Sequence, residues 1–258
     1  MKPVEFVEIA AGAFLIGTPE RELSALAKAY GGTRESYREE SPQCQLSLER
    51  FWIARTPVTN QLYAAYVAET GAAAPLHWRG TQPPLELAEH PVVDINWTDA
   101  VAYCAWLQAR LEAGSITAEG LAWQSGMRVT LPSEAQWERA ARGVDGRVFP
   151  WGDTWDGSRA NTRESGLGAT QPVGSYSSGA SPAGCLDMAG TVWEWTSSLD
   201  RLYPYDPHDG REDQHAGGRR ILRGGCYANP HGYARCACRF RLLPTVRNEF
   251  LGFRLAIV

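Results

Sequence analysis

The chain has 258 residues, of which 44% are hydrophobic and 21% charged, a balance typical of a globular protein that buries a sizeable core. A net charge of −4 argues against nucleic acid as a partner, and no apolar run is long enough to cross a bilayer. The N-terminus is too polar for a secretory signal, so we expect the protein in the cytoplasm. We also expect a monomer.

Short strands and helices are predicted in the first half of the chain. Residues 6–16 predict two strands that turn at Gly12, and residues 45–53 predict a further strand region. Four helices are expected, each beginning beside a capping residue. They cover residues 20–30 after Thr18, residues 61–70 after the phrase 56–60, residues 99–112 after Thr98, and residues 134–142 after Ser133, which forms a capping box with Gln136.

Residues 71–90 are rich in proline, glycine and alanine and are expected to form a long loop anchored by Trp78. The second half of the chain is also rich in glycine and proline, so loops are expected to dominate it. Strands are predicted within residues 186–195, 220–223 and 252–257. Residues 200–218 are polar and contain few core-forming residues, which predicts a mobile insertion.

Nine short phrases occur in an order that is specific to one family. They are residues 11–17, 56–60, 90–97, 131–138, 150–152, 160–161, 190–195, 223–225 and 252–254. In this order they resemble the formylglycine-generating enzymes and their sulfatase-modifying-factor relatives. The resemblance implies a single domain over residues 1–258, with an elaborated C-type-lectin-like fold of the α+β class and little regular secondary structure.

The resemblance also implies where catalytic metal ligands would lie. The two copper-ligating cysteines of the active enzymes correspond to Asn229 and Ala234, and neither offers the soft thiolate that copper(I) prefers. Iron-dependent relatives use a histidine triad, and the five histidines of this chain offer no such cluster. The established forms of catalysis in this family are therefore not expected.

Two other metal sites are considered from the sequence, a soft site at cysteines and a calcium site at an asparagine. Cys236 and Cys238 would face one side of a strand and, with Cys226 or His231, form a soft site. The alternative, which we favour, is that Cys236 is buried, Cys238 lies at the surface, and all six cysteines are free thiols. A structural calcium ion at Asn161 is the one cofactor that the resemblance leaves open.

The C-terminal residues 223–258 combine a regular frame with dissimilar residues between its members. The frame arginines are expected to pair with carboxylates or loop carbonyls. They are Arg235, Arg239, Arg247 and Arg254. The segment resembles the variable proteins of diversity-generating retroelements, in which mutagenesis at adenines converts AAC codons to NNC codons. Such codons never encode Lys, Gln, Glu, Trp or Met, and between Cys226 and Leu251 only Glu249 lies outside the permitted set.

This resemblance implies a non-enzymatic display protein that binds a macromolecular target, most readily another protein, through a variable C-terminal surface. The expected ligand-binding residues are Tyr227, Asn229, His231, Tyr233, Cys238, Phe240, Leu242, Leu243, Thr245, Val246, Asn248 and Phe250. Two alternatives stay open. One is a non-catalytic relative that acquired these residues by drift, and the other is a metal-dependent oxidase acting on cysteine or a thiol.

Overall fold

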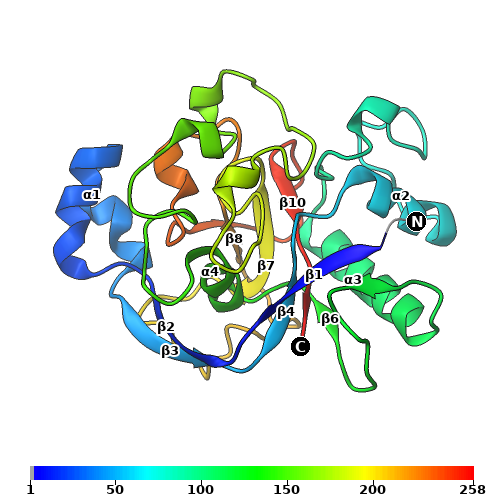
Figure 1. The fold of residues 1–258 in the computed structure, drawn as a ribbon, viewed down its shortest axis with the longest axis horizontal. Coiled ribbons are helices and arrows are strands. Elements are labelled where there is room, and N and C mark those ends of the chain that lie inside the picture. The colour runs from blue at the N-terminus through cyan, green and yellow to red at the C-terminus, as the bar shows by residue number, and fades with distance from the viewer. Residues whose placement is uncertain (1–2) are drawn as a thin grey trace.

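Two mixed sheets and a two-stranded ribbon organise residues 3–258, the part of the chain that the computed structural model describes (Figure 1). The larger sheet has the order β5-β1-β4-β11-β6, the second sheet has the order β10-β7-β8-β9, and the ribbon pairs β2 with β3. The strands are β1 Val4–Ile9, β2 Gly12–Ile16, β3 Cys44–Leu48, β4 Phe51–Ala54, β5 Ala118–Glu119, β6 Val129–Thr130, β7 Trp193–Leu199, β8 Arg220–Arg223, β9 Phe240–Leu242, β10 Leu251–Phe253 and β11 Ala256–Ile257.

The two strands predicted within residues 6–16 are confirmed, but they belong to different sheets. Strands β1 and β2 are both present, yet β1 pairs with β4 whereas β2 pairs with β3. The single strand region predicted at residues 45–53 is therefore two strands, β3 and β4, in different sheets. Strand β4 lies between strands from the two ends of the chain, because Ile53 is paired with Val7 of β1 on one side and with Ala256 of β11 on the other.

All four predicted helices are present, and Figure 1 shows α1 at one side of the molecule with α2 and α3 at the other. They are α1 Leu23–Tyr30, α2 Asn60–Thr70, α3 Trp97–Glu112 and α4 Glu134–Arg142. The predicted capping box of Ser133 and Gln136 is confirmed. The predicted cap of α3 is wrong, because Asn96 rather than Thr98 caps it and forms a box with Asp99. Thr18 also caps no helix, since its hydroxyl bonds to Glu40.

Aromatic side chains from α2 and α3 form the centre of the largest core cluster. The rings of Tyr63 and Tyr103 stack with centroids 5.5 Å apart, and the ring of Phe253 from β10 meets Tyr103 edge-to-face with centroids 5.4 Å apart. Trp78 is buried and donates its indole N–H to Asn60 at 2.9 Å, so it anchors the loop 71–90 as predicted. Burial of each such ring contributes about 1.5–3 kcal/mol to the hydrophobic stabilisation of the fold.

Two expectations about the second half of the chain need correction. The strand predicted at residues 186–195 begins only at Trp193, because Asp187 and Thr191 have φ angles of 56° and 66°, which an extended strand excludes. The segment 200–218 does contain core-forming residues, since Tyr203 and Arg211 are buried. Arg211 was missed because an arginine counts as polar in a sequence pattern, although pairing with acidic groups allows its burial.

Among the described residues, no helix combines the length and apolar character required to cross a membrane.

Candidate functional site

A frame of buried arginines fixes the C-terminal segment 223–258 to the rest of the fold. Four arginines of this segment are 4% exposed or less, and each forms an ion pair with a glutamate. The pairs are Arg223 with Glu138, Arg235 with Glu40, Arg239 with Glu134, and Arg254 with Glu194. The expectation that the arginines of this segment pair with carboxylates is thereby confirmed, and Arg247 also pairs, with Asp99 near the surface.

The pair of Arg235 and Glu40 shows how the frame holds distant segments together. Arg235 donates to both oxygens of Glu40, at 2.7 and 3.2 Å, and its Nε donates to the carbonyl of Gly232 at 2.9 Å. Burial alone would lower the pKa of Arg235, but the Glu40 carboxylate raises it above its usual range. The arginine is therefore charged at every accessible pH, and it ties the 3₁₀ helix Arg34–Glu40 to the C-terminal segment.

Between the frame arginines, exposed side chains form what we call the C-terminal surface. The exposed members are Tyr233, Phe240, Leu243 and Thr245. The half-buried members are Asn229, His231, Leu242, Val246, Asn248 and Phe250. Ten of the predicted ligand-binding residues thus have some access to solvent. The ring of Trp193, which is 4% exposed, supports two of them, since its centroid lies 5.3 Å from that of Phe240 and 6.3 Å from that of Tyr233.

Two predicted binding residues are instead buried. Tyr227 is 8% exposed and packs against Phe250 at 5.4 Å. Cys238 is 7% exposed, so the expectation that it lies at the surface is wrong. The reason is local: its N–H donates to the carbonyl of Arg235, and its own carbonyl accepts from Arg223, which turns the chain inward at this point.

The residues at the family's copper positions do not fit a copper site. The side-chain amide oxygen of Asn229 accepts hydrogen bonds from the Trp193 indole at 2.8 Å and from the Cys226 thiol at 3.1 Å. Ala234 is buried. Burial raises the pKa of Cys236 to about 12 and that of Cys238 to about 11, so both thiols are protonated at neutral pH. Neither the amide of Asn229 nor the methyl group of Ala234 can supply the thiolate that copper(I) prefers.

The soft site proposed around Cys236 and Cys238 is not formed either. The two residues lie before β9 and not on a strand, so the face they were expected to share does not exist. His231 is engaged elsewhere, because its ring stacks on Trp155 at 4.8 Å and bonds to Glu164 at 3.0 Å. Within residues 3–258 no group of three or more His, Cys, Asp or Glu side chains is arranged to hold a metal.

Asn161 has a structural role in its own loop. Its side-chain N–H donates to the carbonyl of Ala169 and its side-chain oxygen accepts from Ser165, both at 2.9 Å. Its backbone carbonyl accepts from Thr191 at 2.7 Å. Since the protein itself uses both ends of the amide, Asn161 does not fit the part of a calcium ligand, which must direct its oxygen at the ion.

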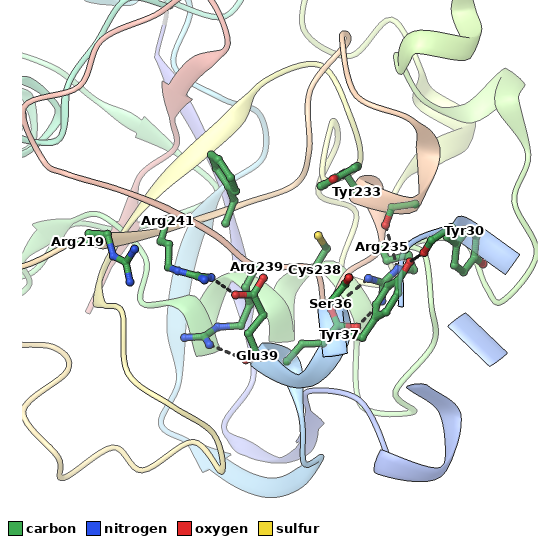
Figure 2. Close-up of a pocket in the computed structure, with 15 residues that line it drawn as sticks. Tyr30, Ser36, Tyr37, Glu39, Arg219, Tyr233, Arg235, Cys238, Arg239 and Arg241 are labelled. Atoms are coloured by element: carbon green, nitrogen blue, oxygen red, sulfur yellow. Dashed lines mark hydrogen bonds and ion pairs between the residues drawn. The ribbon is translucent and has the colours of Figure 1, made fainter. Parts of the chain in front are cut away.

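One part of the site was missed by sequence reasoning. Tyr30, Tyr37 and the 3₁₀ helix Arg34–Glu40 border the C-terminal surface and enclose, with it, a cavity of about 490 Å³ (Figure 2). In the sequence Tyr30 precedes the glycine pair Gly31 and Gly32 and Tyr37 follows it, a pattern that indicates a turn flanked by aromatic residues. It contains no signal that this turn would lie against a segment some two hundred positions away.

The sheets, the irregular loops and the buried arginine frame define an α+β domain with a C-type-lectin-like fold of the formylglycine-generating-enzyme type. Residues 2–258 match the family described as the Sulfatase-modifying factor enzyme 1-like domain, and the chain belongs to this family.

Relatives of the chain include enzymes and a protein named for its variability. It is 27% identical over 320 residues to the Formylglycine-generating enzyme of Bos taurus, covering 98% of this chain and 75% of that protein. It is 32% identical over 248 residues to the Serine/threonine-protein kinase pkn1 of Chlamydia caviae, covering 87% of this chain but only 36% of the kinase. The solved structure of Treponema denticola variable protein 1 is similar with a TM-score of 0.71 at 24% identity, covering 97% and 94% of the two chains. A fold shared this widely does not choose among functions.

Proposed function

We propose that this chain is a non-catalytic binding protein that recognises another protein through its C-terminal surface. The observation that carries the proposal is the difference in burial between the frame arginines and the residues of the C-terminal surface that lie between them. Four arginines of the frame, Arg223, Arg235, Arg239 and Arg254, are buried and paired, whereas Tyr233, Phe240 and Leu243 between them are 45%, 39% and 56% exposed. Large apolar side chains that a fold leaves in water at one place usually mark a contact with another macromolecule.

The chemistry at the family's copper positions supports a binding role over an oxidase. The resemblance places Asn229 and Ala234 where the enzyme requires thiolates, and neither side chain carries a thiol. Incubation with copper(I) and a cysteine-containing substrate peptide tests this directly by mass spectrometry. We expect the peptide cysteine to be unchanged, and its conversion to formylglycine would overturn the proposal.

We further propose that the C-terminal surface belongs to the type diversified by a retroelement. The support is that the restricted residue set lies between buried frame residues, at positions such as Phe240 and Leu243 that can be exchanged without touching the frame. Sequencing the surrounding DNA tests this. We expect a near-identical repeat that differs only at adenines, beside a reverse transcriptase gene. Without that repeat, the chain would be a binding relative with a single fixed target.

Binding through the C-terminal surface can be measured before the natural target is known. Displayed random peptides selected on the wild-type protein provide the probes. A charge at the centre of an apolar contact should weaken them, so we expect Leu243→Asp to reduce their affinity at least about tenfold, equivalent to about 1.4 kcal/mol. Leu85→Asp is the matched control, because Leu85 is 89% exposed in the 3₁₀ helix Leu85–Leu87, outside the C-terminal surface. Equal effects of the two substitutions would overturn the proposal.

A further inference from the structure

The cavity beside the C-terminal surface is built from two segments that are distant in sequence. One wall is C-terminal and includes Tyr233, Cys238 and Phe240, and the other comes from residues 30–40. Figure 2 shows Tyr30 and Tyr37 at one end, Arg219 and Arg241 at the other, with Cys238 between them. At about 490 Å³ the cavity has ample room for one large side chain.

The wall formed by residues 30–40 is held in place before anything binds. The Tyr37 hydroxyl donates to the carbonyl of Gly31 at 2.8 Å, and the Arg235 guanidinium lies 4.8 Å from the Tyr37 ring and 5.7 Å from the Tyr30 ring. Tyr30 is also fixed from behind, since a Cβ atom at Gly232 would lie only 2.8 Å from the Tyr30 Cβ. A preformed aromatic wall loses little conformational entropy when a ligand packs on it.

The charged groups that line the cavity are already neutralised by partners. At its inner end Arg235 pairs with Glu40 and Arg239 pairs with Glu134. At its mouth Arg241 pairs with Glu39, and Arg219 pairs with Asp200. A charged side chain entering the cavity would lose its hydration without gaining a free counter-charge. A neutral aromatic ring would instead pack edge-on or offset against the tyrosines.

We propose that this cavity receives an aromatic side chain of the bound protein, and that Tyr30 and Tyr37 are fixed specificity residues for it. This inference rests on the proposed function, because it supplies the anchor for the same surface. Of the C-terminal lining, Tyr233, Cys238 and Phe240 belong to the positions expected to vary, whereas the tyrosine wall lies outside that segment. Variation would then reshape the C-terminal wall of the cavity while the preference for an aromatic anchor persists.

The test uses small probes, so it does not depend on a known target. N-acetyl-tryptophanamide and N-acetyl-lysinamide are titrated into the isotope-labelled protein, and the backbone amide signals of Gly31, Gly32 and Gly232 are followed by NMR. We expect saturable shifts with the tryptophan probe and none with the lysine probe. Tyr37→Ala should weaken the tryptophan probe at least about fivefold, and Tyr37→Phe, which keeps the ring, should retain it.

A second variant covers the case in which Tyr37→Ala unfolds the protein. Phe240→Ala removes a ring from the opposite, solvent-facing wall and should also weaken the tryptophan probe several-fold. Equal shifts with both probes, shifts outside the cavity, or affinities unchanged in Tyr37→Ala or Phe240→Ala would overturn the inference. If displayed peptides still depend on Leu243 in that event, the proposed function stands and only the aromatic anchor fails. If Leu243→Asp leaves the displayed peptides unaffected, the proposed function fails on its own evidence.

Discussion

Arg235 and Glu40 are 195 positions apart in the chain and form a buried ion pair with two hydrogen bonds, at 2.7 and 3.2 Å. The pair joins the segment that carries the C-terminal surface to the segment that forms the opposite wall of the cavity. Because both side chains are almost completely buried, each charge depends on the other for its stabilisation.

Removal of the Glu40 carboxylate should therefore be costly. Glu40→Ala leaves a buried guanidinium without a counter-charge, and we expect the free energy of unfolding to fall by about 3–5 kcal/mol. Urea unfolding at neutral pH measures it. The control is Glu20→Ala, which removes an exposed partner of Arg34 at 3.3 Å and should cost less than about 1 kcal/mol. Similar losses in the two variants would show that the Arg235 pair contributes no more than a surface pair.

The thiols should differ sharply in reactivity. All six cysteines are free, but only Cys44 is partly exposed, and burial raises the pKa of Cys236 to about 12. Partial burial raises the pKa of Cys44 as well, so its accessibility sets the contrast, and we expect a disulfide reagent to label Cys44 first in the native protein. The other five should react only after unfolding in guanidinium chloride. Rapid labelling of Cys238 in the native state would place it at the surface after all.

Reasoning from residue patterns identified much of the fold, and the limits of that reasoning are physical. Helix α4 was predicted because its capping box is a local signal, read within four residues at Ser133 and Gln136. The resemblance to the variable proteins also identified Arg235, Arg239 and Arg254 as members of the frame. Their partners were not identified, since Glu40 and Glu134 carry no local mark that distinguishes them from surface carboxylates. Pairing across the whole chain is decided by topology.

The same limit explains what was missed at the candidate site. Exposure of Phe240 and burial of Cys238 depend on which way the chain turns after Arg235. That turn depends on two hydrogen bonds of Cys238, one donated to the Arg235 carbonyl and one accepted from the Arg223 guanidinium. The wall containing Tyr37 depends on contacts to residues near the other end of the chain. Residue identity therefore predicted the surface as a segment, but not which side chains within it face water.

Asp187 should make stability depend on pH in an unusual direction. Burial raises the pKa of its carboxyl group from 3.8 to about 6, although the Gly174 N–H donates to it. The folded protein then binds a proton that the unfolded chain has released, so this group favours folding below about pH 4. That contribution is lost as pH rises toward 6. The full difference corresponds to about 3 kcal/mol.

Asp187→Asn tests this linkage, because asparagine keeps a hydrogen-bond acceptor and tolerates the φ of 56°. We expect the variant to be more stable than the wild type above pH 6 and to match it near pH 3, with thermal unfolding followed across this range. A stability difference that is independent of pH would show that Asp187 does not titrate abnormally in the folded state.

Removal of calcium should leave the protein unchanged. Both ends of the Asn161 amide are used within the protein, so we expect EDTA and added calcium to give the same Tm. Asn161→Ala should instead destabilise the fold by about 1–3 kcal/mol, because it removes a fully buried side chain together with its hydrogen bonds to Ala169 and Ser165. A Tm that rises with calcium concentration would reveal binding to the folded state, by mass action.

Gly190 tests whether the loop before β7 is fixed by close packing or by backbone conformation alone. It has a φ of 76°, and a Cβ atom there would lie 2.2 Å from the backbone oxygen of Asn161. Gly166 has a similar φ of 70° but no heavy atom within 4 Å of such a Cβ. Alanine at either position costs about 1–2 kcal/mol from the left-handed conformation.

Only Gly190→Ala must in addition move a backbone carbonyl, the one that accepts from Thr191 at 2.7 Å. We therefore expect Gly190→Ala to lower the free energy of unfolding by more than about 4 kcal/mol and Gly166→Ala by about 1–2 kcal/mol, compared by urea unfolding. Since this loop leads directly into Trp193, which supports Phe240 and Tyr233, Gly190→Ala should also weaken the displayed peptides. Equal destabilisation by the two substitutions would mean that the Asn161 carbonyl gives way freely and that φ alone sets the cost.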